Sequence, residues 1–146
     1  MIRVANAIAI LQREVAEQIL ADGGHFERST MYHALALEDL LDLLNLAACY
    51  PARFSPHRDA LVAWRARIGP MLAWLAAMSH PDGEIAFFND AAIGIAPAPA
   101  LLYDYASRLG FDAPAPPPAL VHLAESGYVR ASVGEAVLIA DAAPIG

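Results

Sequence analysis

Apolar residues recur at the three- and four-residue spacing of an α-helix through most of the first 111 residues. This period gives each segment one apolar face, which is typical of helices that pack together around a core. Glycine and proline interrupt the pattern, because glycine readily ends a helix and proline breaks or kinks one, as expected at Gly69-Pro70. The predicted helices are Val4–Ala21, Thr30–Ala48, His57–Ile68, Met71–Ser79 and Ala100–Leu109.

The pattern changes after residue 111. Residues 112–118 contain four prolines, which no helix can cross, so we interpret residues 112–119 as a linker. Beyond it, Tyr128–Val133 alternates in polarity, Gly134-Glu135 is a turn signal and Ala136–Ala140 is apolar, which predicts an antiparallel β-hairpin. One hairpin is marginally stable in water and leaves open edges. We therefore expect a mainly α fold in which residues 120–146 begin a larger sheet.

Composition limits the classes of protein to which the chain can belong. Hydrophobic residues make up 58% of the chain and charged residues 17%, which favours a folded core over disorder. The formal net charge of −7 disfavours a general nucleic-acid-binding protein, which needs a basic surface. The longest uncharged runs stop short of the roughly 18 residues that a membrane span needs. No span is therefore expected, and the compartment stays undetermined.

Cysteine and histidine usage gives no indication of a cofactor or a metal site. The single cysteine, Cys49, rules out an internal disulfide and a CxxC motif, and we expect it to be a small core residue. His57, His80 and His122 are scattered, without the spacing of metal ligands.

The densest group of reactive side chains lies between residues 22 and 33. Two imidazoles, a carboxylate, a guanidinium and a phenol share a loop and the first turn of the next helix. A helix N-terminus is electropositive and favours anionic ligands, and a phenol beside it can take part in acid–base chemistry. The alternative is a structural loop whose polar side chains cap the helix. The residues concerned are His25, Glu27, Arg28, Tyr32 and His33.

Two other groups have both a binding and a structural interpretation. Trp64 and Trp74 could stack on sugars, but their spacing among leucine, methionine and alanine favours the core. A locally basic stretch could hold an anionic glycan, but a solvated helix face is the simpler interpretation. Its residues are Arg53, Arg58, Arg65 and Arg67.

Three stretches resemble, in the same order, segments of the heparinase II/III family of polysaccharide lyases. The first, DGGHFERSTMYHALALEDLLDLLNL (Asp22–Leu46), is the most specific. The second, HPDGEIAFFNDAAIGIAP (His80–Pro97), and the third, SGYVRASVGEAVLIADAAPIG (Ser126–Gly146), strengthen it by their order and spacing.

The resemblance implies an incomplete α/α toroid followed by an antiparallel β-sandwich. Residues 1–111 would then be part of the toroid, and residues 120–146 the first strands of the sandwich. Such lyases cleave uronic-acid polysaccharides by β-elimination, in which a base removes the C5 proton and an acid protonates the leaving oxygen. Tyr32 matches the family's catalytic tyrosine, and we expect substrate contacts from its neighbours, without a cofactor or a metal. These neighbours are His25, Glu27, Arg28 and His33. Asn89, in the second stretch, is either a substrate-binding residue of a loop that faces the glycan or a residue that caps a turn.

Two parts of the family's catalytic machinery have no counterpart in this sequence. The family's neutralising Asn precedes a His on an upstream helix, whereas Asn6 precedes Ala7 and lies too close to the motif. The family's second catalytic His lies further into the sandwich than residue 146. We therefore expect a fragment of a lyase that is inactive alone. The alternatives are a non-catalytic helical protein, or a split-lyase subunit that associates with itself or with a complementing lyase segment.

Overall fold

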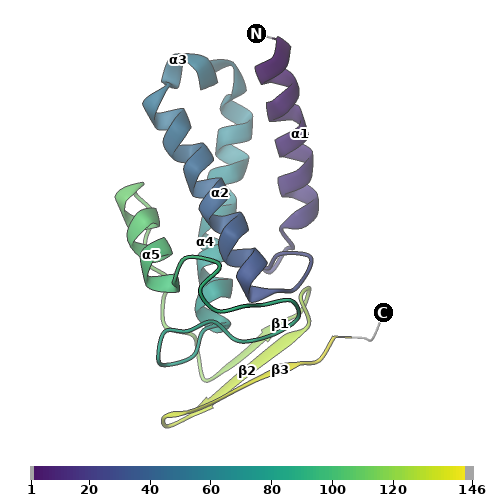
Figure 1. The fold of residues 1–146 in the computed structure, drawn as a ribbon, viewed down its shortest axis with the longest axis vertical. Helices are drawn as coiled ribbons and strands as arrows, with labels where there is room; N and C mark the ends of the chain where they lie inside the picture. Colours follow the sequence, from purple (N-terminus) through teal and green to yellow (C-terminus); the bar gives the residue numbers. More distant parts are fainter. Residues whose placement is uncertain (1, 144–146) are drawn as a thin grey trace.

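The computed structural model describes residues 2–143, with side chains from residue 4 onward. Helices stand side by side in the upper part of the molecule, and a small antiparallel sheet lies across their lower end (Figure 1). This arrangement confirms a mainly α fold with an antiparallel hairpin. The helices are α1 (Ile2–Gln18), α2 (Thr30–Cys49), α3 (Pro51–Phe54), the 3-10 helix η1 (Ser55–His57), α4 (Arg58–Ala77) and α5 (Pro99–Arg108).

Helices α2 and α4 form the centre of the helical part. They are antiparallel neighbours joined by α3 and η1, while α1 and α5 flank them (Figure 1). The buried positions of α2 follow the predicted three- and four-residue spacing, so the apolar face of the sequence is the face that packs. Those positions include Leu37, Leu40, Leu41 and Leu44. No helix in the described part of the chain is long and apolar enough to cross a membrane.

Helix α4 is continuous, so the division into two helices at Gly69-Pro70, one of the two outcomes expected there beside a kink, is wrong. Pro70 lies inside the helix and removes one backbone donor. Ile68, Met71 and Leu72, at most 1% exposed, bury the surrounding turns and hold the helix together around it. The burial of these side chains outweighs the local cost of the proline. This burial depends on neighbouring helices, so the sequence of the segment alone does not show it.

Cys49 is exposed at the end of α2, which corrects its expected place in the core. The last buried residue of this helix is Ala47. Because successive helical residues are separated by about 100°, Cys49 points away from the face that Ala47 buries.

The sheet has three strands in the order β1-β2-β3: β1 (Leu120–Leu123), β2 (Tyr128–Val133) and β3 (Ala136–Asp141). Both pairings are antiparallel, and β2 and β3 form the predicted hairpin. The pattern did not indicate β1, whose four residues are too short for a clear alternation.

A second apolar cluster joins the sheet to the end of α4. Trp74 and Tyr128 are fully buried there, with ring centroids 6.1 Å apart. Trp64 is 1% exposed in the main helical core, so the core interpretation of both tryptophans is confirmed. Arg130 of β2 donates from Nη1 to the carbonyls of Ala77 and Ser79, at 3.2 and 2.9 Å, at the C-terminal end of α4.

Candidate functional site

The loop between α1 and α2 is folded back on itself and held against α4. The Leu20 amide donates to the Gly24 carbonyl and the Phe26 amide to the Gln18 carbonyl, each at 2.8 Å. Gly23 has a φ of 93°, and a Cβ there would collide with the carbonyl of Pro70. Glycine is therefore required at this close approach.

Arg28 turns the chain into α2. Its φ of 57° lies in the left-handed region, which few non-glycine residues adopt. Ser29 follows as the N-cap and accepts a hydrogen bond from the Tyr32 amide at 3.4 Å. Tyr32 lies in the first turn, half-buried and packed against the helical core.

His25 and Glu27 differ sharply in exposure. His25 is 7% exposed, and its Nδ1 accepts from the Glu27 amide at 3.4 Å. Burial lowers the pKa of His25, although the Glu27 carboxylate partly opposes this shift. The imidazole is therefore neutral near pH 7, whereas the exposed Glu27 is free to meet a ligand.

His33 is fully buried, and no atom of it reaches the surface. Its Nε2 lies 3.0 Å from the Met71 carbonyl, and its ring packs on Trp74 with centroids 4.4 Å apart. A proton on Nε2 makes this hydrogen bond and leaves Nδ1 without a partner. Burial lowers the pKa of His33 to about 3. The structure thus gives His33 a place in the core, apart from the accessible side chains of the loop.

The carbonyl of Arg28 joins all three family-like stretches of the sequence. The Tyr128 hydroxyl donates to it at 2.7 Å, and Asn89 Nδ2 donates to it at 3.1 Å. Asn89 Nδ2 is also 3.2 Å from the Tyr128 hydroxyl, which closes the triangle. Asn89 is itself exposed and left-handed, with a φ of 51°. The structure therefore brings Asn89 to the loop that precedes Tyr32.

A second polar network fixes the other end of the same loop. Asp22 Oδ2 accepts from the Ser126 amide at 2.7 Å and from the Ser126 hydroxyl at 2.8 Å. The Trp74 indole donates to the Ser126 hydroxyl at 2.9 Å. The loop, α4 and the turn before β2 are thereby joined by one buried and two part-buried hydrogen bonds.

Sequence reasoning did not assign roles to Asp22, Ser126 and Tyr128. The available signal was their place within the family-like stretches, since Asp22 opens the first stretch and Ser126 and Tyr128 begin the third. Nothing in a linear pattern indicates that residues 104 positions apart share a hydrogen bond.

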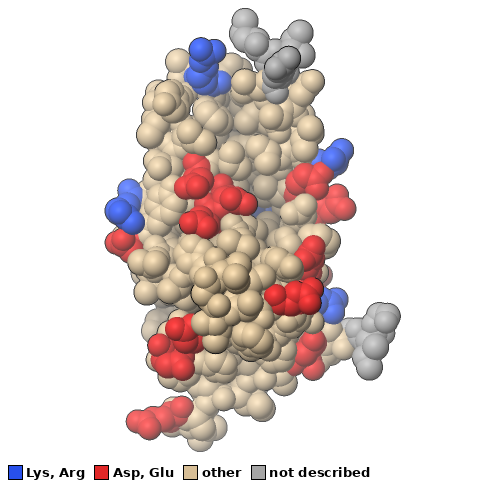
Figure 2. All heavy atoms as spheres, viewed as in Figure 1, with Lys and Arg blue, Asp and Glu red and all other residues tan. Residues whose placement is uncertain are grey.

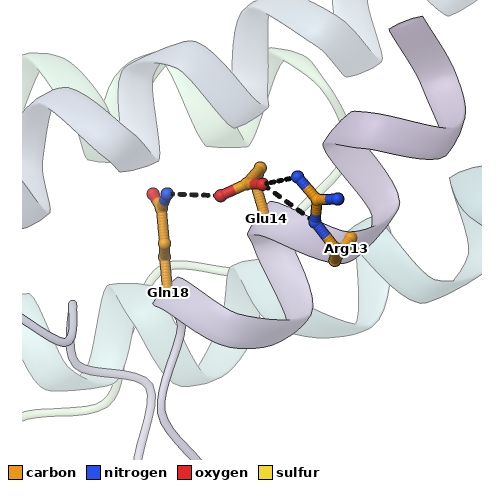
Figure 3. A network of polar contacts seen from close by, with 3 residues as sticks. All are labelled: Arg13, Glu14 and Gln18. Carbon is orange, nitrogen blue, oxygen red and sulfur yellow. Dashed lines mark hydrogen bonds and ion pairs between the residues drawn. The ribbon is translucent and has the colours of Figure 1, made fainter. Parts of the chain in front are cut away.

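A groove lies between α1 and α2, and Tyr32 is not among the residues that line it. Its cavity volume is about 130 Å³, and Ala36 and Asp39 line it with Glu14 and Gln18 of α1. Tyr32 precedes Ala36 by four residues and so lies on the same face of α2. Figure 3 shows Glu14 between Arg13 and Gln18, from which it accepts hydrogen bonds. The Arg13 hydrogen bond holds the pKa of Glu14 below its usual range.

Acidic residues outnumber basic ones in the chain, 16 to 9. Figure 2 shows separate groups of Asp and Glu side chains over the viewed face, with fewer arginines among them. Arg28 is the basic residue of the loop itself, where an anionic ligand would find its guanidinium beside a helix N-terminus. Among residues 2–143, no group of three His, Cys, Asp or Glu side chains could hold a metal ion.

The described chain is thus a helical domain with a small sheet bound at the lower end of its helices. Its second helix is N-capped and carries the half-buried Tyr32 in its first turn. The sequence model of the heparinase II/III N-terminus matches residues 4–103. The chain therefore belongs to the heparinase II/III family, which confirms the resemblance found in the sequence.

A curated protein similar to this chain is named as a lyase. A heparin-sulfate lyase of Bacteroides stercoris is 32% identical over 88 residues, which cover 60% of this chain and 13% of that lyase. The chain thus matches a small part of the length of this relative. No solved structure matches.

Proposed function

We propose that this chain contributes the tyrosine of a heparinase II/III-type lyase that cleaves uronic-acid glycans by β-elimination. The observation that carries the proposal is the position of Tyr32, half-buried in the first turn of an N-capped helix within the family-matched region. Its hydroxyl would exchange protons with the bound sugar, at C5 or at the leaving oxygen.

The residues around Tyr32 divide into ligand contacts and supports. Glu27 is exposed and Arg28 is half-buried, and the guanidinium of Arg28 would pair with a uronate or sulfate group. Asn89 is exposed beside Arg28 and would extend the same contact surface. His25 is 7% exposed and neutral, and its Nδ1 accepts from the Glu27 amide, so its Nε2 would carry the proton and donate one hydrogen bond at the rim. His33 is buried and would support the site by its hydrogen bond to the Met71 carbonyl, without touching the ligand.

The surrounding architecture is part of the same proposal. Helices α1–α5 would belong to an incomplete α/α toroid covering residues 1–111, with residues 112–119 as the linker. The three strands would begin the β-sandwich. Family membership and the order of a helical part followed by an antiparallel sheet support this division.

We expect the 146-residue chain to have no lyase activity alone, since it has no counterpart of the neutralising Asn or of the sandwich His. Losing one group that stabilises developing charge costs on the order of 10² to 10³ in rate. Purified protein should give no ultraviolet-absorbing unsaturated product from heparan sulfate, alginate or oligouronates. Turnover that Tyr32→Phe abolishes would contradict the expected inactivity but support the role of Tyr32.

Ligand binding tests the site without requiring turnover. With ¹³C-labelled tyrosine, we expect a sulfated uronate oligosaccharide to shift the ring signal of Tyr32, which Tyr32→Phe identifies by its loss. The distant Tyr105 provides an internal reference within the same sample. Equal or absent shifts at the two rings would count against a saccharide site at Tyr32.

A second candidate is a non-catalytic subunit that binds a complementing lyase segment or another copy. The sheet register aligns Leu120, Ala131 and Leu138 in one row, and the two leucines are 67% and 64% exposed. Apolar rows of this kind favour association. Light scattering should then show a mass above the monomer that Leu138→Lys reduces. A clean monomer without binding of a dye for exposed apolar surface would argue against this candidate.

A further inference from the structure

The turn that leads into Tyr32 is held by residues far from it in the sequence. Arg28 is left-handed and directly precedes the N-cap of α2. Left-handed backbone at a non-glycine residue is unfavourable and persists where surrounding contacts enforce it. The carbonyl of Arg28 meets both Asn89 and Tyr128, so this turn has two such contacts.

Both donors are themselves fixed. The Tyr128 ring packs against Phe88 and Trp74, with centroids 5.0 and 6.1 Å away. This packing fixes the position of the Tyr128 hydroxyl. Burial, with the nearby carboxylate of Asp141 as a smaller cause, raises the pKa of Tyr128 to about 12. The hydroxyl therefore stays protonated and able to donate at neutral pH. The Asn89 amide donates to both oxygens of the triangle.

We infer that Asn89 and Tyr128 are positioning residues for Tyr32, because they hold the Arg28 carbonyl and thereby fix the first turn of α2. This inference rests on the proposed role of Tyr32. It gives the sheet a part in the site: its β2 strand supplies the hydroxyl that sets the loop, although Tyr128 lies 100 residues from Arg28.

Three variants of the 146-residue chain test the inference. Tyr128→Phe removes the hydroxyl and keeps the packed ring, and Asn89→Gly removes the amide while tolerating the left-handed backbone. Tyr105→Phe is the matched control, because it removes a tyrosine hydroxyl that donates to Asp42 of α2 at 2.6 Å, nearly three turns beyond Tyr32. Amide hydrogen exchange and the ¹³C ring signal of Tyr32 are read for each variant.

Tyr128→Phe and Asn89→Gly should each quicken amide exchange at Arg28 and Tyr32 by about five- to tenfold, which corresponds to losing one hydrogen bond of about 1 kcal/mol. Both should also shift or broaden the Tyr32 ring signal, while buried amides of α4 keep their protection. Tyr105→Phe should leave the loop and the ring signal unchanged.

Unchanged exchange and ring signals in both test variants, or equal changes in Tyr105→Phe, would overturn the inference. If Tyr128→Phe does not fold, the exposed Asn89→Gly decides the outcome. The glycan titration is separate: a Tyr32 signal that responds to these variants but not to the oligosaccharide would support the positioning role and contradict the proposed function.

Discussion

His33 shows how burial overrides the usual behaviour of a side chain. Next to a candidate catalytic tyrosine, a histidine suggests acid–base chemistry, yet this imidazole is fully buried and bonded to the backbone of α4. With a pKa of about 3, it remains neutral throughout the range in which free histidine titrates. Its contribution is to link the first turn of α2 to Met71.

The depressed pKa of His33 predicts a pH dependence of stability. In the unfolded chain histidine titrates near 6.5, so between about pH 6.5 and pH 3 the unfolded state binds more protons than the folded state. The free energy of unfolding should therefore fall with acidification, with His33 contributing up to about 1.4 kcal/mol per pH unit in that window.

Urea unfolding at a series of pH values measures this slope. His33→Gln should be less stable near pH 7 and have a shallower acid limb than the wild type. His80→Gln, at an exposed histidine, is the matched control. Parallel curves for the wild type and His33→Gln would show that His33 does not carry the effect.

At the scale of elements, the loop between α1 and α2 depends on close contact with α4. Gly23 and Gly110 both have positive φ, but an added Cβ meets the Pro70 backbone at Gly23 and open space at Gly110. Gly110→Ala should therefore cost about 1 kcal/mol through backbone strain alone. Gly23→Ala should cost about 1–3 kcal/mol more, because the collision adds an overpacking term. Equal losses in denaturant unfolding would contradict the close contact.

Helix periodicity and turn chemistry were sufficient to predict most elements. The apolar faces of α2 and α4 and the β2–β3 hairpin follow from local pattern, because each is a property of consecutive residues. The continuity of α4 through Pro70 could not be predicted locally, since it depends on burial between helices. The exposure of Cys49 depends on where the core ends, which is a property of neighbouring elements.

The candidate site was only partly predictable, for the same reason. Tyr32 and Arg28 were identified because they belong to one contiguous stretch. The contacts that fix their loop come from Ser126 and Tyr128, which the chain brings back across the linker. Sequence separation hides such contacts, whereas the left-handed φ of Arg28 becomes explicable only once they are known.

At the scale of the whole molecule, buried and part-buried polar contacts cross the boundary between helices and sheet. Asp22 accepts two hydrogen bonds from Ser126, and Arg130 donates to carbonyls at the end of α4. Trp74 and Leu123 belong to the apolar cluster at the same boundary. A boundary that is both apolar and hydrogen-bonded couples the stability of its two sides.

We therefore predict that the helical part and the sheet unfold in one cooperative transition. In Trp64→Phe, far-ultraviolet circular dichroism follows the helices, while the fluorescence of the remaining Trp74 follows the boundary. The two midpoints should coincide. Asp22→Asn removes the charge from both hydrogen bonds to Ser126 and should lower the shared midpoint, because such bonds to charged groups contribute about 1.5–3 kcal/mol. A fluorescence transition at lower denaturant than the helical transition in Trp64→Phe would instead mean that the sheet separates first, and that the strands are an independent unit resting on α4.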